Sequence, residues 1–194
     1  MKTQFTLISI FFSCFMVGCQ STPKAPQLAP SLVPNATTAQ SNRHSFKISG
    51  KIGVRTAQQN GSAFYGWTQQ GDEFAIDLTG ALGIGQTSIR GNAEQVTLTS
   101  SKTGTLEAAT PEELLFQATK WRAPITYLIS WINGQPVKED SMIQRDPLNR
   151  VVSIDEGGWH ANLNYEGVEK LPNKLVLVEN NHDNRVTLTI QSRE

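Results

Sequence analysis

Cys19 is the residue of this chain whose type and position most directly suggest chemistry, because its thiol follows a segment that resembles an export signal. That segment begins with one basic residue, Lys2, and continues with an uncharged apolar stretch from Phe5 to Val17. A small residue, Gly18, stands directly before the thiol. A basic start, a short apolar run and a small residue at the junction are typical of a secretory signal peptide. We therefore expect residues 1–18 to be a signal peptide.

The junction at Cys19 resembles the lipobox of bacterial lipoproteins, in which the cysteine is acylated and becomes the first residue of the mature chain. Val17 and Gly18 fit this pattern, whereas Met16 stands where Leu is usual. The resemblance implies that Cys19 carries three acyl chains, and two chains already anchor a protein stably to a membrane. The alternative is an ordinary signal peptide or membrane anchor with an incidental cysteine. Because Cys14 lies in the segment that is removed, we expect no internal disulfide.

Side chains suited to catalysis or metal binding are not grouped along the sequence. The three histidines, His44, His160 and His182, lie far apart, and none belongs to a zinc-binding spacing such as HExxH. Gly83-Ile84-Gly85 precedes a predicted strand, whereas a phosphate-binding loop precedes a helix. We therefore expect no enzymatic activity, no cofactor and no metal site. Lys and Arg are scattered along a chain of zero formal net charge, which argues against nucleic-acid binding.

The rest of the chain divides into a linker and a folded domain. Residues 20–42 are rich in Pro, Ser, Thr, Ala and Gln, a composition that buries too little apolar surface to order itself. We expect residues 19–42 to form a lipidated N-terminus and flexible linker, and residues 43–194 to form the domain. The domain begins with alternating apolar residues, and Asn60-Gly61 predicts a hairpin turn. Further strands are predicted around residues 63–68, 74–78, 86–91 and 95–100.

Two helices are predicted in the middle of the domain. Thr110-Pro111-Glu112-Glu113 combines an N-cap Thr, Pro at the first helical position and Glu at the third, which is a capping box. A second helix follows Pro124, and Gly134 stands where a C-capping glycine belongs. The apolar stripes of the two helices consist of Leu114, Ala118 and Trp121, and of Ile125, Leu128, Ile129 and Ile132.

Strand patterns resume after Asp146-Pro147 and continue to Ile190. Strands, two helices and strands again indicate a mainly β (α+β) domain with one antiparallel meander, which curls or closes into a barrel around a helical insert. Between two of the first strands, the segment from Thr79 to Gly85 contains three glycines together with apolar Leu82 and Ile84. Either Leu82 folds back onto the core, or the segment is an apolar tip that contacts lipid or a partner.

The inward-facing apolar residues allow two interpretations. They form either an ordinary packed core or an apolar cavity that holds acyl chains beneath the helices. Period-two alternation does not say which strand face is concave. If the interior is hollow, the expected lining residues are Trp67, Phe74, Ile76, Leu78 and Ile89 from strands and Trp121, Leu128 and Trp131 from helices.

Six short blocks of this chain resemble, in order, those of LolB, a family of outer-membrane lipoprotein receptors. Ala81 departs from the family pattern, because Pro is common there before the Leu-Gly pair. The blocks are Gly50–Val54, Trp67–Gly71, Leu78–Gly83, Trp131–Pro136, Gly158–Tyr165 and Leu171-Pro172.

The resemblance implies an incomplete antiparallel β-barrel with a helical lid over an apolar cavity. It also implies a monomeric receptor, anchored in the outer membrane and facing the periplasm, that accepts acylated lipoproteins from the periplasmic carrier LolA. The receptor then inserts these clients into the inner leaflet of the outer membrane without a cofactor. Gln20, which follows the lipidated cysteine, agrees with outer-membrane sorting, where Asp would cause retention in the inner membrane. The alternative is a structural or assembly lipoprotein of the envelope with a packed β core.

Overall fold

The computed structural model describes residues 45–57, 60–80, 86–180 and 184–194, which belong to one compact unit. Their strands form an antiparallel sheet of eleven strands in the order β6-β5-β4-β3-β2-β1-β11-β10-β9-β8-β7. The sheet is open, because its edge strands β6 and β7 have no strand partner on their outer sides within the described residues. The strands are β1 (Phe46–Arg55), β2 (Asn60–Gln70), β3 (Glu73–Thr79), β4 (Thr87–Gly91), β5 (Val96–Ser100), β6 (Gly104–Ala108), β7 (Met142–Arg145), β8 (Val151–Glu156), β9 (Trp159–Asn164), β10 (Lys174–Glu179) and β11 (Arg185–Arg193).

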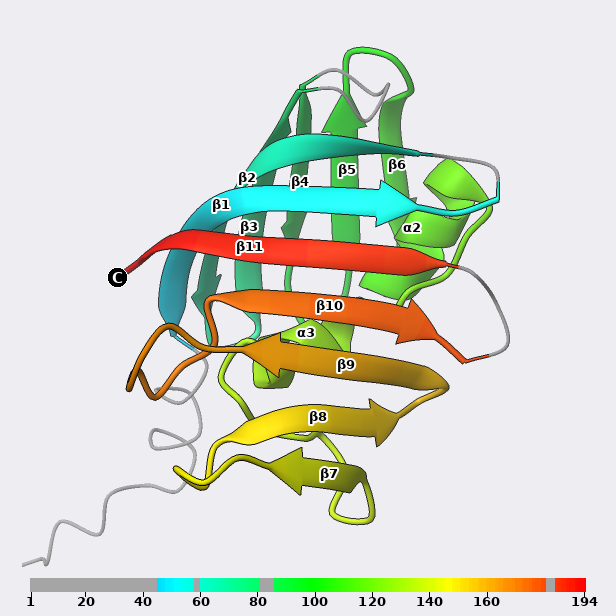
Figure 1. The fold of residues 1–194 in the computed structure, drawn as a ribbon. Helices are drawn as coiled ribbons and strands as arrows, with labels where there is room; N and C mark the ends of the chain where they lie inside the picture. Colours follow the sequence, from blue (N-terminus) through cyan, green and yellow to red (C-terminus); the bar gives the residue numbers. More distant parts are fainter. Residues whose placement is uncertain (1–44, 58–59, 81–85, 181–183) are drawn as a thin grey trace, which may run out of the picture. The chain divides into compact units, whose positions relative to one another are not determined.

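The first and last strands meet in the middle of the sheet (Figure 1). β1 pairs with β2 on one side and with β11 on the other, so the two halves of the meander join along this pair. At one end of the pair, the backbones of Lys47 and Glu194 exchange two hydrogen bonds of 3.1 and 2.8 Å. Gly50 lies at a β-bulge in β1, where a Cβ would stand only 1.9 Å from the carbonyl oxygen of Thr189.

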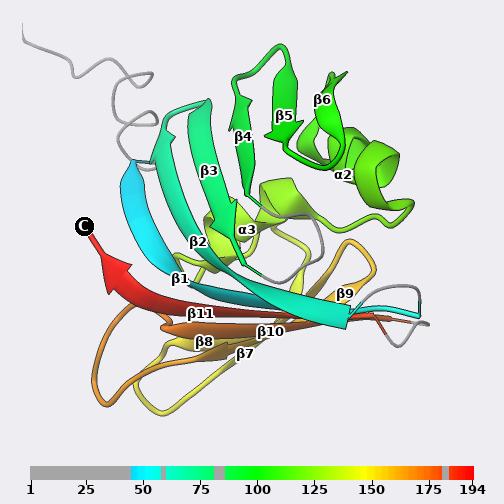
Figure 2. The same ribbon diagram turned by 90° about the horizontal axis from the view of Figure 1, so that it is seen from above.

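Helices α2 (Pro111–Thr119) and α3 (Ile125–Trp131) follow β6 and lie on the inner side of the curved sheet (Figure 2). The predicted N-cap is confirmed, because the Thr110 hydroxyl accepts a hydrogen bond of 3.2 Å from the amide of Glu113. The prediction of Gly134 as the C-capping glycine is wrong, because the C-cap is Ile132 in the right-handed helical conformation. Gly134, with a φ of +71°, lies in the turn that follows and donates a hydrogen bond of 2.9 Å from its amide to the Trp131 carbonyl.

The sequence prediction that Trp121 belongs to the first helix is wrong. Lys120 takes the left-handed conformation, with a φ of 62°, and ends α2. The hydroxyl of Thr119 donates to the Leu115 carbonyl and accepts from the amide of Trp121 at 3.2 Å. These local bonds satisfy backbone groups that a longer helix would have used, so Trp121 lies in the connection between the helices.

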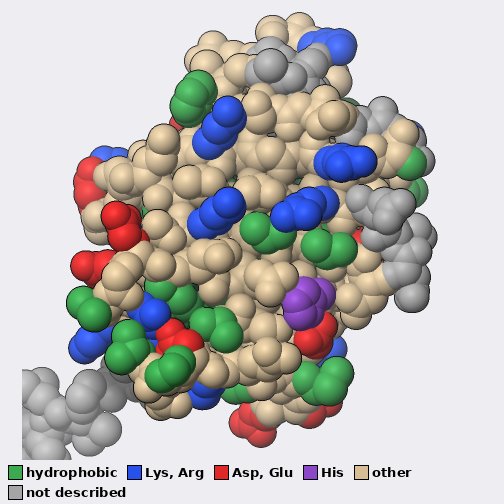
Figure 3. Space-filling view, viewed as in Figure 1, with side chains coloured by type: hydrophobic (Ala, Val, Ile, Leu, Met, Phe, Trp, Pro, Cys, Tyr) green, Lys and Arg blue, Asp and Glu red, His purple; other side chains and the backbone are tan. Residues whose placement is uncertain are grey.

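The two faces of the sheet differ in polarity. Inward side chains from strands of both halves form one apolar core with Trp131 and Ile132, and a smaller cluster of Val96, Leu98 and Leu114 lies beneath α2. The outer face, seen in Figure 3, carries charged side chains on its central strands.

The edge strands β6 and β7 were not predicted. β7 offers no period-two pattern because all four of its residues are exposed.

Glu156, the last residue of β8, ties the helical insert to the sheet. Its carboxylate lies in the interior and accepts hydrogen bonds from the indole Nε1 of Trp131 and from the hydroxyl of Ser141. It also accepts from the backbone amides of Val137 and Lys138, each at 3.0 Å. One carboxylate therefore holds the end of α3, the connection after it and an edge of the sheet together.

The charge of Glu156 is stabilised by these four donors. Burial alone raises the pKa of the Glu156 carboxyl, but the hydrogen bonds from Ser141, Val137, Trp131 and Lys138 outweigh it and lower the pKa below the ordinary value of 4.5. Because the folded pKa is the lower one, Glu156 contributes stability that is complete above the ordinary value. That contribution is lost as the pH falls through the folded pKa.

We predict that Glu156→Gln lowers the free energy of unfolding at pH 7 by about 1.5–3 kcal/mol or more, because an amide nitrogen replaces an acceptor that faces several donors. The difference from the unsubstituted protein should shrink as the pH falls from 4.5 through the lower folded pKa, because the carboxyl of the unfolded chain takes up a proton first. Urea unfolding at a series of pH values measures both effects. Glu107→Gln, an exposed change on β6, is the control and should leave stability nearly unchanged. Equal effects of the two substitutions would contradict the role of Glu156.

Candidate functional site

An apolar pocket of about 440 Å³ lies on the inner face, between β2 and β3 on one side and the helical insert on the other. Its volume falls within the range typical of sites for small molecules. Trp67, Phe74 and Ile76 line it from the sheet, and Ile125, Tyr127 and Ile129 line it from α3. Asp72, Thr126, Ser130 and Val137 are among the other residues that line it.

The polar groups of the sheet wall are satisfied internally. Trp67 Nε1 donates a hydrogen bond of 3.1 Å to Oε1 of Gln69, and Nε2 of Gln69 donates one of 2.6 Å to the Gly71 carbonyl. The indole of Trp67 also packs edge-on against the ring of Phe46, with a centroid distance of 5.1 Å. Gln69 is only 2% exposed, so this wall offers few free polar groups to a ligand.

The helix wall is positioned by aromatic packing and by one glycine. The ring of Tyr127 packs edge-on against Trp131, with a centroid distance of 5.7 Å. Gly157 lies against the same ring and has a φ of +61°; a Cβ there would stand 2.6 Å from the ring. Neither Gly157 nor Tyr127 was singled out from the sequence. The pairing of a glycine with a distant aromatic ring has no local sequence signal.

The two helices are joined to each other at an exposed point. The carboxylate of Glu112, in the first turn of α2, accepts hydrogen bonds from the amide and the hydroxyl of Thr126, both at 2.8 Å. Thr126 lies in the first turn of α3, so the bond connects the two helix starts. Because it is exposed to water, it contributes less than the buried Glu156 contacts at the other end of α3.

The residues predicted to line a cavity lie in different surroundings. Trp67, Phe74 and Ile76 are brought together in the pocket. Leu78 and Leu128 are partly buried beside the main core, and Ile89 packs against the smaller cluster under α2. Trp131 is fully buried in the core. Trp121 packs edge-on against Trp159 at 6.0 Å between ring centroids, and its Nε1 is buried without a hydrogen-bond partner in the described part of the chain.

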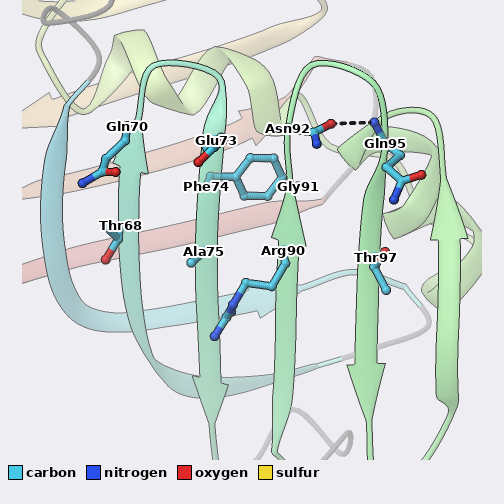
Figure 4. Close-up of a pocket in the computed structure, with 10 residues that line it drawn as sticks. All are labelled: Thr68, Gln70, Glu73, Phe74, Ala75, Arg90, Gly91, Asn92, Gln95 and Thr97. Carbon is cyan, nitrogen blue, oxygen red and sulfur yellow. Dashed lines mark hydrogen bonds between the residues drawn. The ribbon is translucent and has the colours of Figure 1, made fainter.

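Phe74 also borders a second hollow of about 390 Å³, which lies beside β3, β4 and the turn after β4. Figure 4 shows the ring of Phe74 directed toward Gly91, its register partner on β4. A Cβ at Gly91 would stand 2.5 Å from that ring, so glycine is required for Phe74 to lie where it does. The other side chains around this hollow, such as Thr68, Glu73 and Arg90, are polar or charged. We therefore take the more apolar pocket beneath the helices as the candidate site.

Polar pairs on the outer face do not form a reactive cluster. His160 Nδ1 lies 2.7 Å from a carboxylate oxygen of Asp155, its neighbour across the strand pair. The flanking cross-strand residues are Val178 and Met142, which supply no nucleophile.

Among the described residues, no group of three or more His, Cys, Asp or Glu side chains could hold a metal ion. Within the same residues, neither helix has the length and apolar character needed to cross a membrane.

Three predicted functional residues, Cys19, Leu82 and Ile84, lie outside the residues that the structure describes.

Comparison with known proteins gives the family. A family model described as outer membrane lipoprotein LolB matches residues 44–192, nearly the whole described fold. The chain belongs to the LolB family. Membership places the protein among the outer-membrane lipoproteins and confirms the resemblance noted in the sequence.

Individual relatives agree with the LolB assignment. The outer-membrane lipoprotein LolB of Stutzerimonas stutzeri is 34% identical over 151 residues, covering 75% of this chain and 72% of the relative. That of Pseudomonas fluorescens is 32% identical over 150 residues, with the same coverage. Among solved structures, a LolA superfamily protein from Nitrosomonas europaea covers 81% of this chain and 92% of its own, at 8% identity and a TM-score of 0.45.

We predict that polar substitutions separate the pocket from the packed core. Ile76→Ser, at the half-buried pocket wall, should lower the free energy of unfolding by only about 1 kcal/mol. Ile154→Ser, at a fully buried position, should lower it by about 2–5 kcal/mol for the lost side chain alone. Chemical denaturation of the two variants measures this contrast. A large loss of stability for Ile76→Ser would indicate that β3 is packed like the rest of the core.

Proposed function

We propose that this protein accepts acylated lipoproteins from a LolA-like periplasmic carrier and inserts them into the inner leaflet of the outer membrane. The observation that carries the proposal is the incompletely filled inner face of a LolB-family chain. Phe74 and Ile76 on β3 point inward yet are only partly buried, whereas Ile154 on β8 and Leu175 on β10, in the other half of the same face, are fully buried. The structural or assembly lipoprotein considered from sequence would need no such unfilled apolar wall.

In this proposal an acyl chain of the client occupies the pocket beneath α3. Each methylene moved from water into an apolar site contributes about 0.8 kcal/mol, so binding needs no specific polar contact. The internal pairing of Trp67 with Gln69 supports this role, because it leaves the sheet wall without unsatisfied groups that an acyl chain would desolvate.

The helical insert acts as a lid over the bound chain. The two ends of α3 are held by contacts of unequal strength. The end of α3 is held in the interior by Glu156 and by Arg193, whose Nη2 donates a hydrogen bond of 2.8 Å to the Ile132 carbonyl. The start of α3 is hydrogen-bonded to the start of α2 through the exposed Glu112 and Thr126 side chains. Opening would therefore begin at the start of α3, beside the pocket, with the far end as the fixed point.

Transfer through such a site requires no nucleotide. A client moves from carrier to receptor and on to the bilayer if each acceptor binds its acyl chains more tightly than the one before. The Cys19 acyl group would anchor the receptor, and residues 19–42 would give the domain its reach from the membrane. The apolar residues Leu82 and Ile84 would contact lipid during delivery.

We predict that Ile76→Ser weakens the uptake of a fluorescent fatty acid by at least about tenfold, because it removes several methyl and methylene contacts from the pocket wall. The measurement uses the purified chain with Cys19→Ala, so that its own acyl group does not compete. Val176→Ser makes a similar chemical change on the outward side of β10 and should leave uptake unchanged. If the chain that carries neither Ile76→Ser nor Val176→Ser takes up no fatty acid, the result favours a fully packed interior.

We predict that Leu82→Glu impairs release of clients into membranes but not their acceptance from the carrier, because a charged side chain opposes insertion into lipid. Transfer is followed in two steps, from the carrier to the receptor and from the receptor to phospholipid vesicles. Leu78→Ala, on the inner side of β3, serves as the comparison for a change that alters the interior. Normal release by Leu82→Glu, or an early thermal unfolding of this variant, would remove the delivery role.

A further inference from the structure

Four basic side chains gather on the outer face of the central strands. Lys51 and Arg55 belong to β1, Arg185 to β11 and Lys174 to β10, and all four are exposed. Strand register brings them together: Lys51 stands opposite Thr189, Thr189 opposite Lys174, and Arg55 opposite Arg185. In the sequence Lys51 and Arg55 lie more than a hundred positions before Lys174 and Arg185, so the grouping of the two pairs is a property of the fold.

Three acidic residues on this face are paired with basic side chains. Asp77 binds Arg90 at 2.9 Å, Glu194 binds Lys47 at 3.0 Å, and Asp155 lies 2.7 Å from His160. Within the described part of the chain, none of the four gathered cations takes part in an ion pair with a carboxylate. Figure 3 shows Lys and Arg side chains over the central strands, with Asp and Glu toward the left and lower margins. A chain of zero formal net charge therefore presents a positive surface on one side.

An exposed aromatic residue adjoins the cations. Phe64 on β2 stands opposite Lys51 on β1 and is 59% exposed. Phe64, Lys51, Thr189 and Lys174 thus form one row across four adjacent strands. With strands about 4.8 Å apart, the row spans about 14 Å. A single exposed apolar side chain is common on a protein surface, but Phe64 differs from the others in lying in one row with two cations.

We propose that this basic face, defined by Phe64, Lys51, Lys174, Arg55 and Arg185, docks onto an anionic phospholipid surface. Unpaired Lys and Arg attract anionic headgroups, and an aromatic ring among them enters the interfacial region, which is the pattern of peripheral membrane contact. A lipid surface is favoured over an acidic protein because this is an outer-membrane lipoprotein family. A tether at a membrane keeps the domain at high local concentration beside that surface.

Docking through the outer face would set the orientation of the domain. The pocket lies on the inner face, so the helical insert would be turned away from the lipid and left accessible to a carrier. This deepens the proposed function by describing the orientation for receiving a client, but binding to lipid through the basic face does not require the pocket. The two proposals therefore fail independently.

The test measures binding of the chain with Cys19→Ala, exported behind a signal peptide that is cleaved without acylation, to sedimented vesicles. Vesicles of phosphatidylcholine alone are compared with vesicles containing phosphatidylglycerol. Each cation near an anionic surface contributes a factor of about five, which is about 1 kcal/mol. Lys51→Glu with Lys174→Glu should therefore reduce binding to the anionic vesicles by about 25-fold or more. High salt should likewise weaken the binding of the chain with an unsubstituted basic face to the anionic vesicles.

Matched controls separate this face from general charge. Lys138→Glu with Lys170→Glu changes the net charge equally at exposed sites elsewhere and should alter binding by less than about twofold. Phe64→Ser should weaken binding by about fivefold, whereas Val168→Ser, at another exposed apolar residue, should not. If the double glutamate variant unfolds, Lys51→Gln with Lys174→Gln replaces it. The proposal would be overturned if the Lys138 and Lys170 variant lost as much vesicle binding as the Lys51 and Lys174 variant. It would also be overturned if the unsubstituted chain bound anionic vesicles no more tightly than vesicles of phosphatidylcholine alone. Unchanged fatty-acid uptake by the Lys51 and Lys174 variant shows that the pocket is unaffected.

Discussion

The buried carboxylate of Glu156 is the interaction on which the arrangement of this fold most depends. An open sheet of short strands has no closed barrel wall to hold a helical insert in place, so the insert needs its own attachment. Glu156 supplies it by accepting hydrogen bonds from α3, from the connection after α3 and from Ser141. With that end fixed, Tyr127 and Trp131 are placed against the inner face, and the space between α3 and β3 is defined.

The inner face combines two states of packing on one continuous sheet. Its β8 to β11 half is filled, with Ile154, Leu175 and Leu177 almost completely buried. On β3, by contrast, side chains of similar size remain partly exposed to the pocket. A filled half provides the stability that an unfilled half lacks, so a binding space can exist without loss of the fold. The ring of Phe74, which lies over Gly91, closes the wall between the pocket and the hollow beside it.

Local patterns in the sequence predicted much of this structure, and long-range pairings account for what they missed. The cap at Thr110 is encoded within a few residues and was predicted correctly, whereas the C-cap of α3 is Ile132 and not the predicted Gly134. Trp121 was assigned to a helix because its spacing fits, although the hydroxyl of Thr119 ends that helix earlier. Alternation alone selects Trp67, Phe74 and Ile76 as a group of inward-facing residues. It does not show that Phe74 and Ile76 stay partly exposed to the pocket while Trp131 is fully buried. The donors to Glu156 have no local signal because they depend on how the helical insert packs against β8. The grouping of the four outer cations has none because it depends on strand register.

The pairing of β1 with β11 has a consequence for how the protein matures. The two strands at the centre of the sheet come from opposite ends of the domain, and Lys47 is hydrogen-bonded to Glu194. A nascent chain therefore has no complete central pair until its last strand has been delivered to the compartment where it folds. Contacts so distant in sequence also make folding slow. The final strand, β11, thus acts as the closing step of assembly, because only its pairing with β1 joins the two halves of the sheet.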